Sequence, residues 1–256
     1  MAALRIDFNC DLGEGCGQDA AIVPLISSAS LACGGHAGDA RTMREAVELC
    51  LAHGVAIGAH PSLVDHEGFG RRDLPVTAAE VEDLVSRQLE TLAAVVEAAG
   101  GRLAHLKPHG ALYNRAARDH AIADAIARAT ARFDRGLALY GLAGSELTVA
   151  AAGFGLRPVH EVFAERRYGA DGRLVPRGEP GAVIETTAEA VQQVLSLLRD
   201  GTVIAIGGET IPVRSESLCL HGDRPDAAAF ARVLRETLEA EGVEIRAPSA
   251  ATSQCS

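Results

Sequence analysis

Lysine is almost absent from this sequence of 256 residues: Lys107 is the only one, and the other 23 of its 24 basic residues are arginine. An arginine stays protonated at any accessible pH, whereas a buried lysine can shift its pKa and presents a compact charge. Lys107 follows a short apolar run that predicts a buried strand, and Pro108 ends that strand. We therefore expect this single lysine to belong to a functional site at a strand end.

Positive charge and long apolar runs are also lacking. The net charge is −10, whereas nucleic-acid-binding proteins usually present a basic face. No apolar run approaches the roughly 20 residues of a membrane-spanning helix. The first five residues lead directly into a strand-like run, so we expect no signal peptide and a cytoplasmic location. These absences predict neither a nucleic acid nor a membrane as a partner.

The cysteines lack the spacing of a metal or disulfide framework. There are six of them, with no Cys-x-x-Cys pair and no pattern of a small secreted domain. We interpret them as small buried hydrophobic residues in a reducing compartment. They are Cys10, Cys16, Cys33, Cys50, Cys219 and Cys255.

The usual nucleotide-binding motifs are absent as well. The only lysine is followed by proline and not by serine or threonine, which excludes a Walker A loop. The glycines at 13, 15 and 17 do not have the spacing of a dinucleotide-binding turn. There is no Gly-x-Ser-x-Gly nucleophile elbow. Any ATP site must therefore be built in another way.

What the sequence does contain is a regular alternation of strands and helices. Strands are predicted at 4–10, 27–33, 55–59, 103–107, 137–142, 156–159 and 217–220. Helices are predicted at 40–53, 77–99, 115–133, 144–153, 186–198 and 225–241, with a hairpin at 202–213 and a loop excursion at 161–180. Asp39 and the Thr77-to-Glu80 and Thr186-to-Glu189 boxes are helix-start signals, and Gly54 is a stop signal.

This alternation predicts an α/β fold with a parallel sheet and right-handed crossovers. The length matches the roughly 250 residues of a typical (β/α) barrel. We expect one barrel domain at 5–245 and a loose tail at 246–256.

Polar residues gather where the predicted strands end. The first strand alternates, with Asp7, Asn9 and Asp11 on one face, which suits a polar barrel interior. In a closed barrel the carboxyl ends of all strands meet at one mouth, where barrel enzymes keep their active sites. The residues at or just after strand ends are Asp11, His36, His60, Lys107, His109, His160, Glu161, His221 and Asp223. We expect this set to form the site.

A metal is an alternative reading of part of this set. Asp11, His36 and His60 could form a nitrogen and oxygen site with an open position. The histidines do not have the local spacing of a metal-binding helix, and the same groups serve equally as acids and hydrogen-bond donors. We therefore predict no metal ligands, with the metal site as the minority interpretation.

Long motifs in this sequence resemble those of a known family. They are DFNCDLGE at 7–14, ACGGHAGD at 32–39, IGAHPS at 57–62, GFGRR at 68–72, LKPHGALYN at 106–114, VPR at 175–177, PGAV at 180–183 and CLHGD at 219–223. Over residues 5–242 the chain resembles the LamB/YcsF family, whose members form the first of the three kinds of subunit in 5-oxoprolinase. One departure is the loop at 15–19, which is shorter than is usual in the family.

The resemblance implies a distorted barrel of seven strands, related to the glycoside hydrolase and polysaccharide deacetylase barrels. It also implies ATP-dependent opening of the lactam of 5-oxoproline to L-glutamate, together with partner subunits B and C. ATP, with a divalent cation such as Mg²⁺, would be the cofactor. Whether the chain also forms homo-oligomers stays open.

The reaction needs a cation at the transferring phosphate, a base for water and an acid for the leaving nitrogen. We place Lys107 at the phosphate or oxyanion, Asp11 or His60 as the base, and His36 and His109 as donors or acids. Residues expected to bind the substrate are Asn9, Glu14, Arg72, Tyr113, Glu161, Arg177, His221 and Asp223. Arginines in the loops, among them Arg71, Arg166 and Arg167, could bind a carboxylate or phosphates.

Two other functions remain open from the sequence. The first is a metal-dependent deacetylase or amidase that works without ATP. The second is a non-catalytic subunit that binds the substrate and delivers it to a partner.

Overall fold

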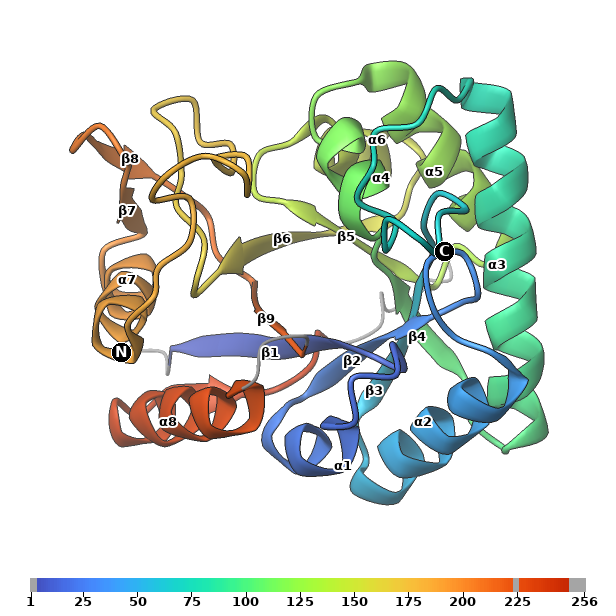
Figure 1. The fold of residues 1–256 in the computed structure, drawn as a ribbon, viewed down its shortest axis with the longest axis horizontal. Helices are drawn as coiled ribbons and strands as arrows, with labels where there is room; N and C mark the ends of the chain where they lie inside the picture. Colours follow the sequence, from blue (N-terminus) through green and yellow to red (C-terminus); the bar gives the residue numbers. More distant parts are fainter. Residues whose placement is uncertain (1–3, 223–225, 249–256) are drawn as a thin grey trace, which may run out of the picture.

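The centre of the molecule is a closed barrel of parallel strands (Figure 1). The structure, a computed structural model, describes residues 4–222 and 226–248. Each of seven strands pairs with its neighbour in parallel, and the last pairs back onto the first. In barrel order they are β1 Arg5–Leu12, β2 Ser28–Ala32, β3 Ala56–His60, β4 Leu103–Leu106, β5 Ala138–Leu142, β6 Arg157–Phe163 and β9 Ser217–His221. The predicted seven-stranded barrel is confirmed.

Helices surround the barrel on the outside (Figure 1). They are α1 Asp19–Ile22, α2 Ala40–His53, α3 Ala78–Ala98, α4 Gly110–Ala116, α5 His120–Phe133, α6 Glu146–Gly153, α7 Thr187–Arg199 and α8 Ala227–Ala240, with a 3₁₀ turn η1 at Val23–Leu25. A hairpin of β7 Thr202–Ile204 and β8 Thr210–Pro212 stands beside α7, and β10 Glu244–Ile245 extends the sheet at β1. None of the described helices is long and apolar enough to cross a membrane.

The sequence signals for helix ends act as predicted at α2 and α3. The Asp39 side chain accepts hydrogen bonds from two backbone N–H groups of the first turn, and Gly54 ends α2 in the left-handed conformation. Thr77 and Glu80 form a reciprocal capping box at the start of α3. Thr186 caps α7 through the backbone N–H of Glu189.

Two predicted boundaries are wrong. The expected helix 115–133 is two helices, because the chain turns at 117–119, where Asp119 caps α5. The sixth strand does not stop at 159 but continues to Phe163, since its later residues pair with β9. This extension places His160 and Glu161 within the strand. Alternation along the strand then decides which of the two faces the barrel interior. The short elements α1, η1 and β10 have too few residues to show periodicity in the sequence.

Polar side chains fill the lower barrel interior, as the alternation of β1 predicts. Asp7 is buried, and its carboxylate accepts hydrogen bonds from Ser27, Ser28, Ser217 and Tyr140 at 2.6–2.9 Å. Burial raises the pKa of Asp7, although these four hydroxyl donors oppose the shift. Every oxygen of this buried carboxylate therefore has a partner, which offsets much of its desolvation cost.

The prediction for the cysteines is correct for four of them. Cys10, Cys33, Cys50 and Cys219 are buried and free, but Cys16 is exposed in the loop after β1, where glycines prevent the chain from packing. Cys255 and most of the expected tail lie outside the described residues. The start of that tail is bound, since the Arg246 backbone donates to Ile6.

Candidate active site

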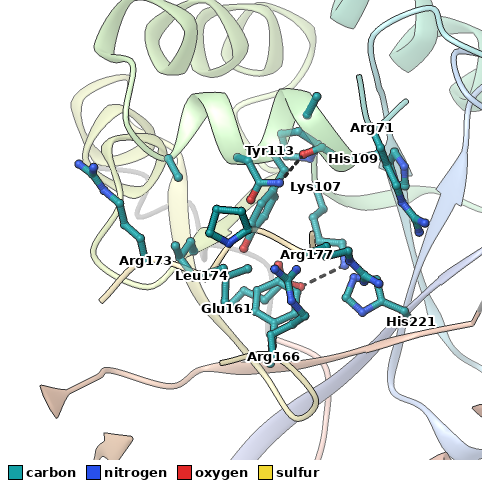
Figure 2. Close-up of a pocket in the computed structure, with 18 of the residues that line it drawn as sticks. Arg71, Lys107, His109, Tyr113, Glu161, Arg166, Arg173, Leu174, Arg177 and His221 are labelled. Atoms are coloured by element: carbon teal, nitrogen blue, oxygen red, sulfur yellow. Dashed lines mark hydrogen bonds and ion pairs between the residues drawn. The ribbon is translucent and has the colours of Figure 1, made fainter. Parts of the chain in front are cut away.

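A cavity of about 420 Å³ opens at the carboxyl ends of the strands (Figure 2). Its polar lining includes Asp11, His60, Arg71, Lys107, His109, Tyr113, Glu161, Arg166, Arg177 and His221. Parallel strands bring these residues together because most of them end or follow different strands. The gathering of strand-end residues expected from the sequence is thus present in the structure.

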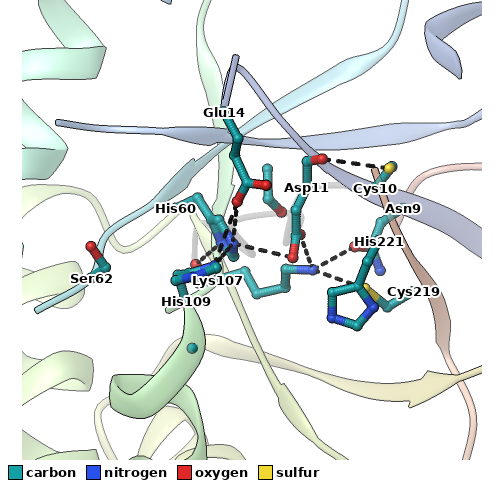
Figure 3. A network of polar contacts seen from close by, with 12 residues as sticks. Asn9, Cys10, Asp11, Glu14, His60, Ser62, Lys107, His109, Cys219 and His221 are labelled. Carbon is teal, nitrogen blue, oxygen red and sulfur yellow. Dashed lines mark hydrogen bonds and ion pairs between the residues drawn. The ribbon is translucent and has the colours of Figure 1, made fainter. Parts of the chain in front are cut away.

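Lys107 lies at the bottom of this cavity with its ammonium group enclosed (Figure 3). The side chain is 2% exposed. Its Nζ donates to Asn9 Oδ1 at 2.8 Å, Glu161 Oε1 at 3.1 Å and Cys219 Sγ at 3.2 Å, and it lies 2.5 Å from Asp11 Oδ1. Asn9 in turn donates to Glu161 and Ser217, which fixes its orientation. The single lysine is therefore a fixed cation between two carboxylates.

The charges of this group keep one another ionised. Burial alone would lower the pKa of Lys107, but the charge of Asp11, followed by Cys219 and Glu161, raises it well above its ordinary value. Burial would likewise raise the pKa of Asp11, but the charges of His60 and Lys107 hold it well below its ordinary range. Lys107 consequently acts as a permanent cation and not as a base.

His60 and His109 form a pair beside this cation. His60 Nδ1 faces the Lys107 carbonyl oxygen at 2.8 Å, and His109 Nε2 faces the Phe69 carbonyl oxygen at 2.9 Å. A carbonyl only accepts, so both of these nitrogens carry protons. The remaining nitrogens, His60 Nε2 and His109 Nδ1, lie 3.0 Å apart. A hydrogen bond between them requires one additional proton, which the Asp11 carboxylate stabilises at 3.2 Å from His60 Nε2.

His36 and Glu14 complete the cluster. His36 Nε2 lies 2.9 Å from Glu14 Oε1, and its Nδ1 lies 3.0 Å from the Ser62 hydroxyl. The His36 ring stacks on His109 at 3.7 Å. Burial, and then the charge of His60, lower the pKa of His36 to about 3 and also lower that of His109. Both rings are therefore neutral at physiological pH.

The histidine cluster has the donor set of a metal site but not its ring orientation. Ligand atoms of Glu14, His36, His60 and His109 all lie within 4.8 Å of one another. A tetrahedral zinc ion would separate its ligands by about 3.3 Å. A ring nitrogen binds a metal in the plane of its ring, but the His36 and His109 planes are parallel to within 4°. One of these two rings would have to rotate before both could bind the same ion.

The loop before α3 closes over this cluster. Phe69 adopts a φ of 53°, a left-handed conformation that is uncommon for an aromatic residue and concentrates at functional sites. Its ring contacts His36 and His109 edge-on at 5.2 and 5.6 Å. At Gly70, a Cβ atom would lie 2.9 Å from atoms of both histidines, so only glycine lets the loop approach them.

Tyr113 and Glu161 form the next part of the cavity wall. Burial, and then the charge of Glu161, raise the pKa of Tyr113 well above its ordinary value. Among the described residues, neither the Tyr113 hydroxyl nor Glu161 Oε2 makes a hydrogen bond of standard geometry. Both residues line the cavity, where the Tyr113 hydroxyl and the Glu161 carboxylate act on each other.

Arg72 and His160 lie outside the site, whereas Asn9, Glu14 and His36 belong to its polar network without lining the cavity. Arg72 does not line the cavity, because its guanidinium is bound to Asp65. His160 faces away from the interior, as alternation along the longer β6 requires when Glu161 faces inward, and it accepts from the Gly144 backbone. His221 lines the cavity and pairs with Glu165 at 2.5 Å, whereas Asp223 lies outside the described residues.

Two contributors to the site, Cys219 and Phe69, are not predicted from the sequence. Cys219, which was expected only to pack in the core, contacts Lys107. The sequence signal that could have indicated this contact is its position two residues before His221, because residues two apart on a strand face the same side. Phe69 is visible in the sequence only as part of a glycine-rich loop. Arg166, expected among the loop arginines, is 5% exposed at the cavity wall.

The fold and this site together define a (β/α) barrel protein with a buried cation and a histidine–carboxylate cluster at the mouth of the barrel. A family model described as the LamB/YcsF family matches residues 6–253. The chain therefore belongs to the LamB/YcsF family.

Solved structures agree with this assignment. The crystal structure of a lactam utilization protein from Thermus thermophilus is 45% identical, with a TM-score of 0.89 over 95% of this chain and 100% of that one. A putative cellobiose-phosphate cleavage protein from Enterococcus faecalis has a TM-score of 0.58 at 13% identity, covering 95% and 97% of the two chains. The catalytic domain of a peptidoglycan N-acetylglucosamine deacetylase from Eubacterium rectale has 0.55 at 11%, covering 97% and 90%. The last two show the shared fold alone.

Proposed function

We propose that this protein is one of the subunits of an ATP-dependent 5-oxoprolinase, which opens the lactam of 5-oxoproline to L-glutamate while ATP is hydrolysed to ADP and phosphate. Membership of the LamB/YcsF family and the 45% identity to a lactam utilization protein support a role in lactam hydrolysis. The observation that carries the proposal is the enclosed cation of Lys107 beside a histidine pair, in a cavity large enough for a five-membered ring.

Lys107 supplies the positive charge that this reaction needs. An amide carbonyl is a poor electrophile, and phosphorylation of its oxygen by ATP makes it a good one. Negative charge on the transferring phosphoryl group or on the tetrahedral oxygen is stabilised best by a cation that is already in place. Asp11 and Glu161 hold the ammonium group at the bottom of the cavity and keep it protonated. ATP would enter with Mg²⁺, and subunits B and C would complete the assembly.

The histidine pair and Glu161 account for the proton transfers. The additional proton between His60 and His109 is available to the lactam nitrogen when the amide C–N bond breaks, because His109 lines the cavity. Glu161 lines the cavity beside Lys107, and its carboxylate would accept the proton of the attacking water. His36, neutral and behind His109, positions Glu14 and the His109 ring.

Reconstitution tests this function directly. The full chain combined with subunits B and C is expected to release glutamate and phosphate in equal amounts from 5-oxoproline and ATP, with neither product formed when ATP is omitted. Glutamate release without ATP would contradict the proposal. If His109→Gln leaves the assembled complex fully active, this chain binds the substrate without carrying out the chemistry.

The cluster of Glu14, His36, His60 and His109 favours one second candidate, a metal-dependent amidase. In that case the purified protein would retain about one zinc ion per chain, a chelator would remove activity, and zinc would restore it. We expect the opposite result: less than 0.1 ion per chain, as an order of magnitude for an unfilled site. His160→Asn, at the histidine outside the cavity, is the control for nonspecific metal binding.

A further inference from the structure

One end of the cavity carries positive charge that no ion pair among the described residues balances. The segment between β6 and α7 contributes Arg166, Arg173 and Arg177 to the lining (Figure 2). Arg173 pairs with Asp171, and across the cavity Arg118 pairs with Asp73. Within the described part of the chain, Arg166 and Arg177 have no ion pair. The acidic neighbour of Arg166, Glu165, makes its ion pair with His221.

Arg166 is held in place but only partly satisfied. Its Nη2 donates to the Val175 carbonyl oxygen at 2.6 Å, and the residue is 5% exposed. Its Nε is buried without a hydrogen-bond partner among the residues that the structure describes. A guanidinium that is fixed at one nitrogen and open at another presents a preformed donor to an anion.

Arg177 lines the same cavity as Arg166. Burial, and then the positive charge of Arg177, lower the pKa of Arg166 to about 10. The positive charge of the buried Arg166 is disfavoured by burial and by Arg177, and a bound anion would offset both effects. Arg166 also acts electrostatically on Tyr113, whose neighbour Glu161 contacts Lys107. Arg166, Arg177 and Lys107 line the same cavity as Tyr113 and Glu161 (Figure 2).

We propose that Arg166 and Arg177 bind the carboxylate of the ligand, so that the cavity selects cyclic amides that carry an acid group over neutral lactams. The anion-binding role stands on the two arginines alone, whereas the identification of the ligand as a lactam rests on the proposed function. The apolar side chains of Leu142, Phe163 and Leu174 line the same cavity, and they suit the methylene groups of a lactam ring. Anchoring the carboxylate at the arginines turns the amide toward Lys107.

Calorimetric binding to the full chain tests this subsite without requiring turnover. The ligands are 5-oxoproline, its carboxamide, cyclopentanecarboxylate, inorganic phosphate and ATP. Wild type is expected to bind 5-oxoproline about 10- to 100-fold more tightly than the carboxamide, as for a lost charge-assisted pair of hydrogen bonds. Arg166→Gln should remove this preference while leaving carboxamide binding unchanged.

Arg177→Gln is a second test for the case in which loss of the buried Arg166 side chain unfolds the segment. Because Arg177 is exposed, its replacement should leave the fold of the segment intact. We expect it to weaken 5-oxoproline binding about 3- to 10-fold. Arg167→Gln is the matched control: it removes a charge from the adjacent position, where the side chain pairs with Glu189 on α7 and does not line the cavity. Its affinity for 5-oxoproline should equal that of wild type.

The outcomes separate the two proposals. Equal binding of 5-oxoproline by wild type and both cavity variants overturns the arginine subsite but leaves the lactam function intact. Arginine-dependent binding of cyclopentanecarboxylate, without binding of either lactam, keeps the subsite and rejects the lactam ligand. Arginine-dependent binding of phosphate or ATP alone, or no binding of any ligand, overturns the carboxylate subsite.

Discussion

Lys107→Met is expected to reduce turnover of the assembled 5-oxoprolinase by about 10²- to 10³-fold, the usual cost of one preorganised charge-stabilising group. The reason is that no other cation of the described chain reaches the position between Asp11 and Glu161 at the bottom of the cavity. The measurement is coupled release of glutamate and phosphate at saturating substrate. An unchanged rate would remove the lysine from the chemistry.

The same substitution should also destabilise the fold, by about 3–5 kcal/mol at neutral pH, because two buried carboxylates lose their counter-charge. In wild type, the lowered pKa of Asp11 means that its stabilisation is present above its unfolded pKa of about 3.9 and is lost as pH falls through the lower folded value. In the variant, the Asp11 pKa rises because the charge of Lys107 no longer lowers it, so the deficit is largest at high pH and shrinks on acidification. Urea unfolding at several pH values measures this.

Cys219→Ser is the control for the lysine variant. It changes a contact of the ammonium group, at 3.2 Å, without changing the charge of the cluster. We expect stability within about 1 kcal/mol of wild type, since the hydroxyl can replace the thiol as acceptor. A stability loss equal to that of Lys107→Met would mean that packing, and not charge, explains both.

Gly58→Ala is expected to destabilise the protein by about 3 kcal/mol, the upper range for overpacking a buried site. Gly58 lies on β3, and a Cβ atom there would overlap the His105 ring. That ring cannot move away easily, because it is buried, contacts Ser30 at 3.2 Å and packs on Tyr140 at 4.3 Å. The midpoint of urea unfolding should fall with little change in the slope.

Gly153→Ala is the matched control for this glycine. It ends α6, and a Cβ atom there would meet nothing within 4 Å. Alanine should be neutral or stabilise by up to about 1 kcal/mol, through helix propensity alone. Adding His105→Ala to Gly58→Ala should recover part of the lost stability. If it does not, the His105 ring is not what excludes a side chain at position 58.

The sequence alone was sufficient for the fold and for most of the site. Alternating strand and helix signals predicted a parallel barrel, and a parallel barrel brings all strand ends to one mouth, whatever the details of packing. Asp11, His60, Lys107, His109 and His221 therefore meet as expected. Asn9 and Glu161 also belong to the site: both accept hydrogen bonds from Lys107, and Glu161 lines the cavity as well.

Where the prediction failed, the place of a side chain depended on a shift of one position along a strand or on the partner that a loop arginine contacts. His160 and Glu161 are neighbours in sequence, and alternation sends them to opposite faces, so the true end of β6 determines which one joins the site. Arg72 and Arg166 are both loop arginines, but Arg72 finds Asp65 whereas Arg166 finds only a carbonyl and a cavity. These partners lie seven and nine residues away along the chain, so the conformation of each loop, which no periodic pattern encodes, decides them.

The sequence by itself determined the barrel, the single lysine and the identity of the polar groups at its mouth, because those follow from local periodicity and residue type. Only the tertiary structure decided the charge states and the direction of each side chain. Lys107 keeps its proton because Asp11 and Glu161 surround it, and His36 and His109 are neutral because burial and His60 disfavour their charged forms. Electrostatic energies depend on distance and burial, and those quantities exist only once the chain has folded.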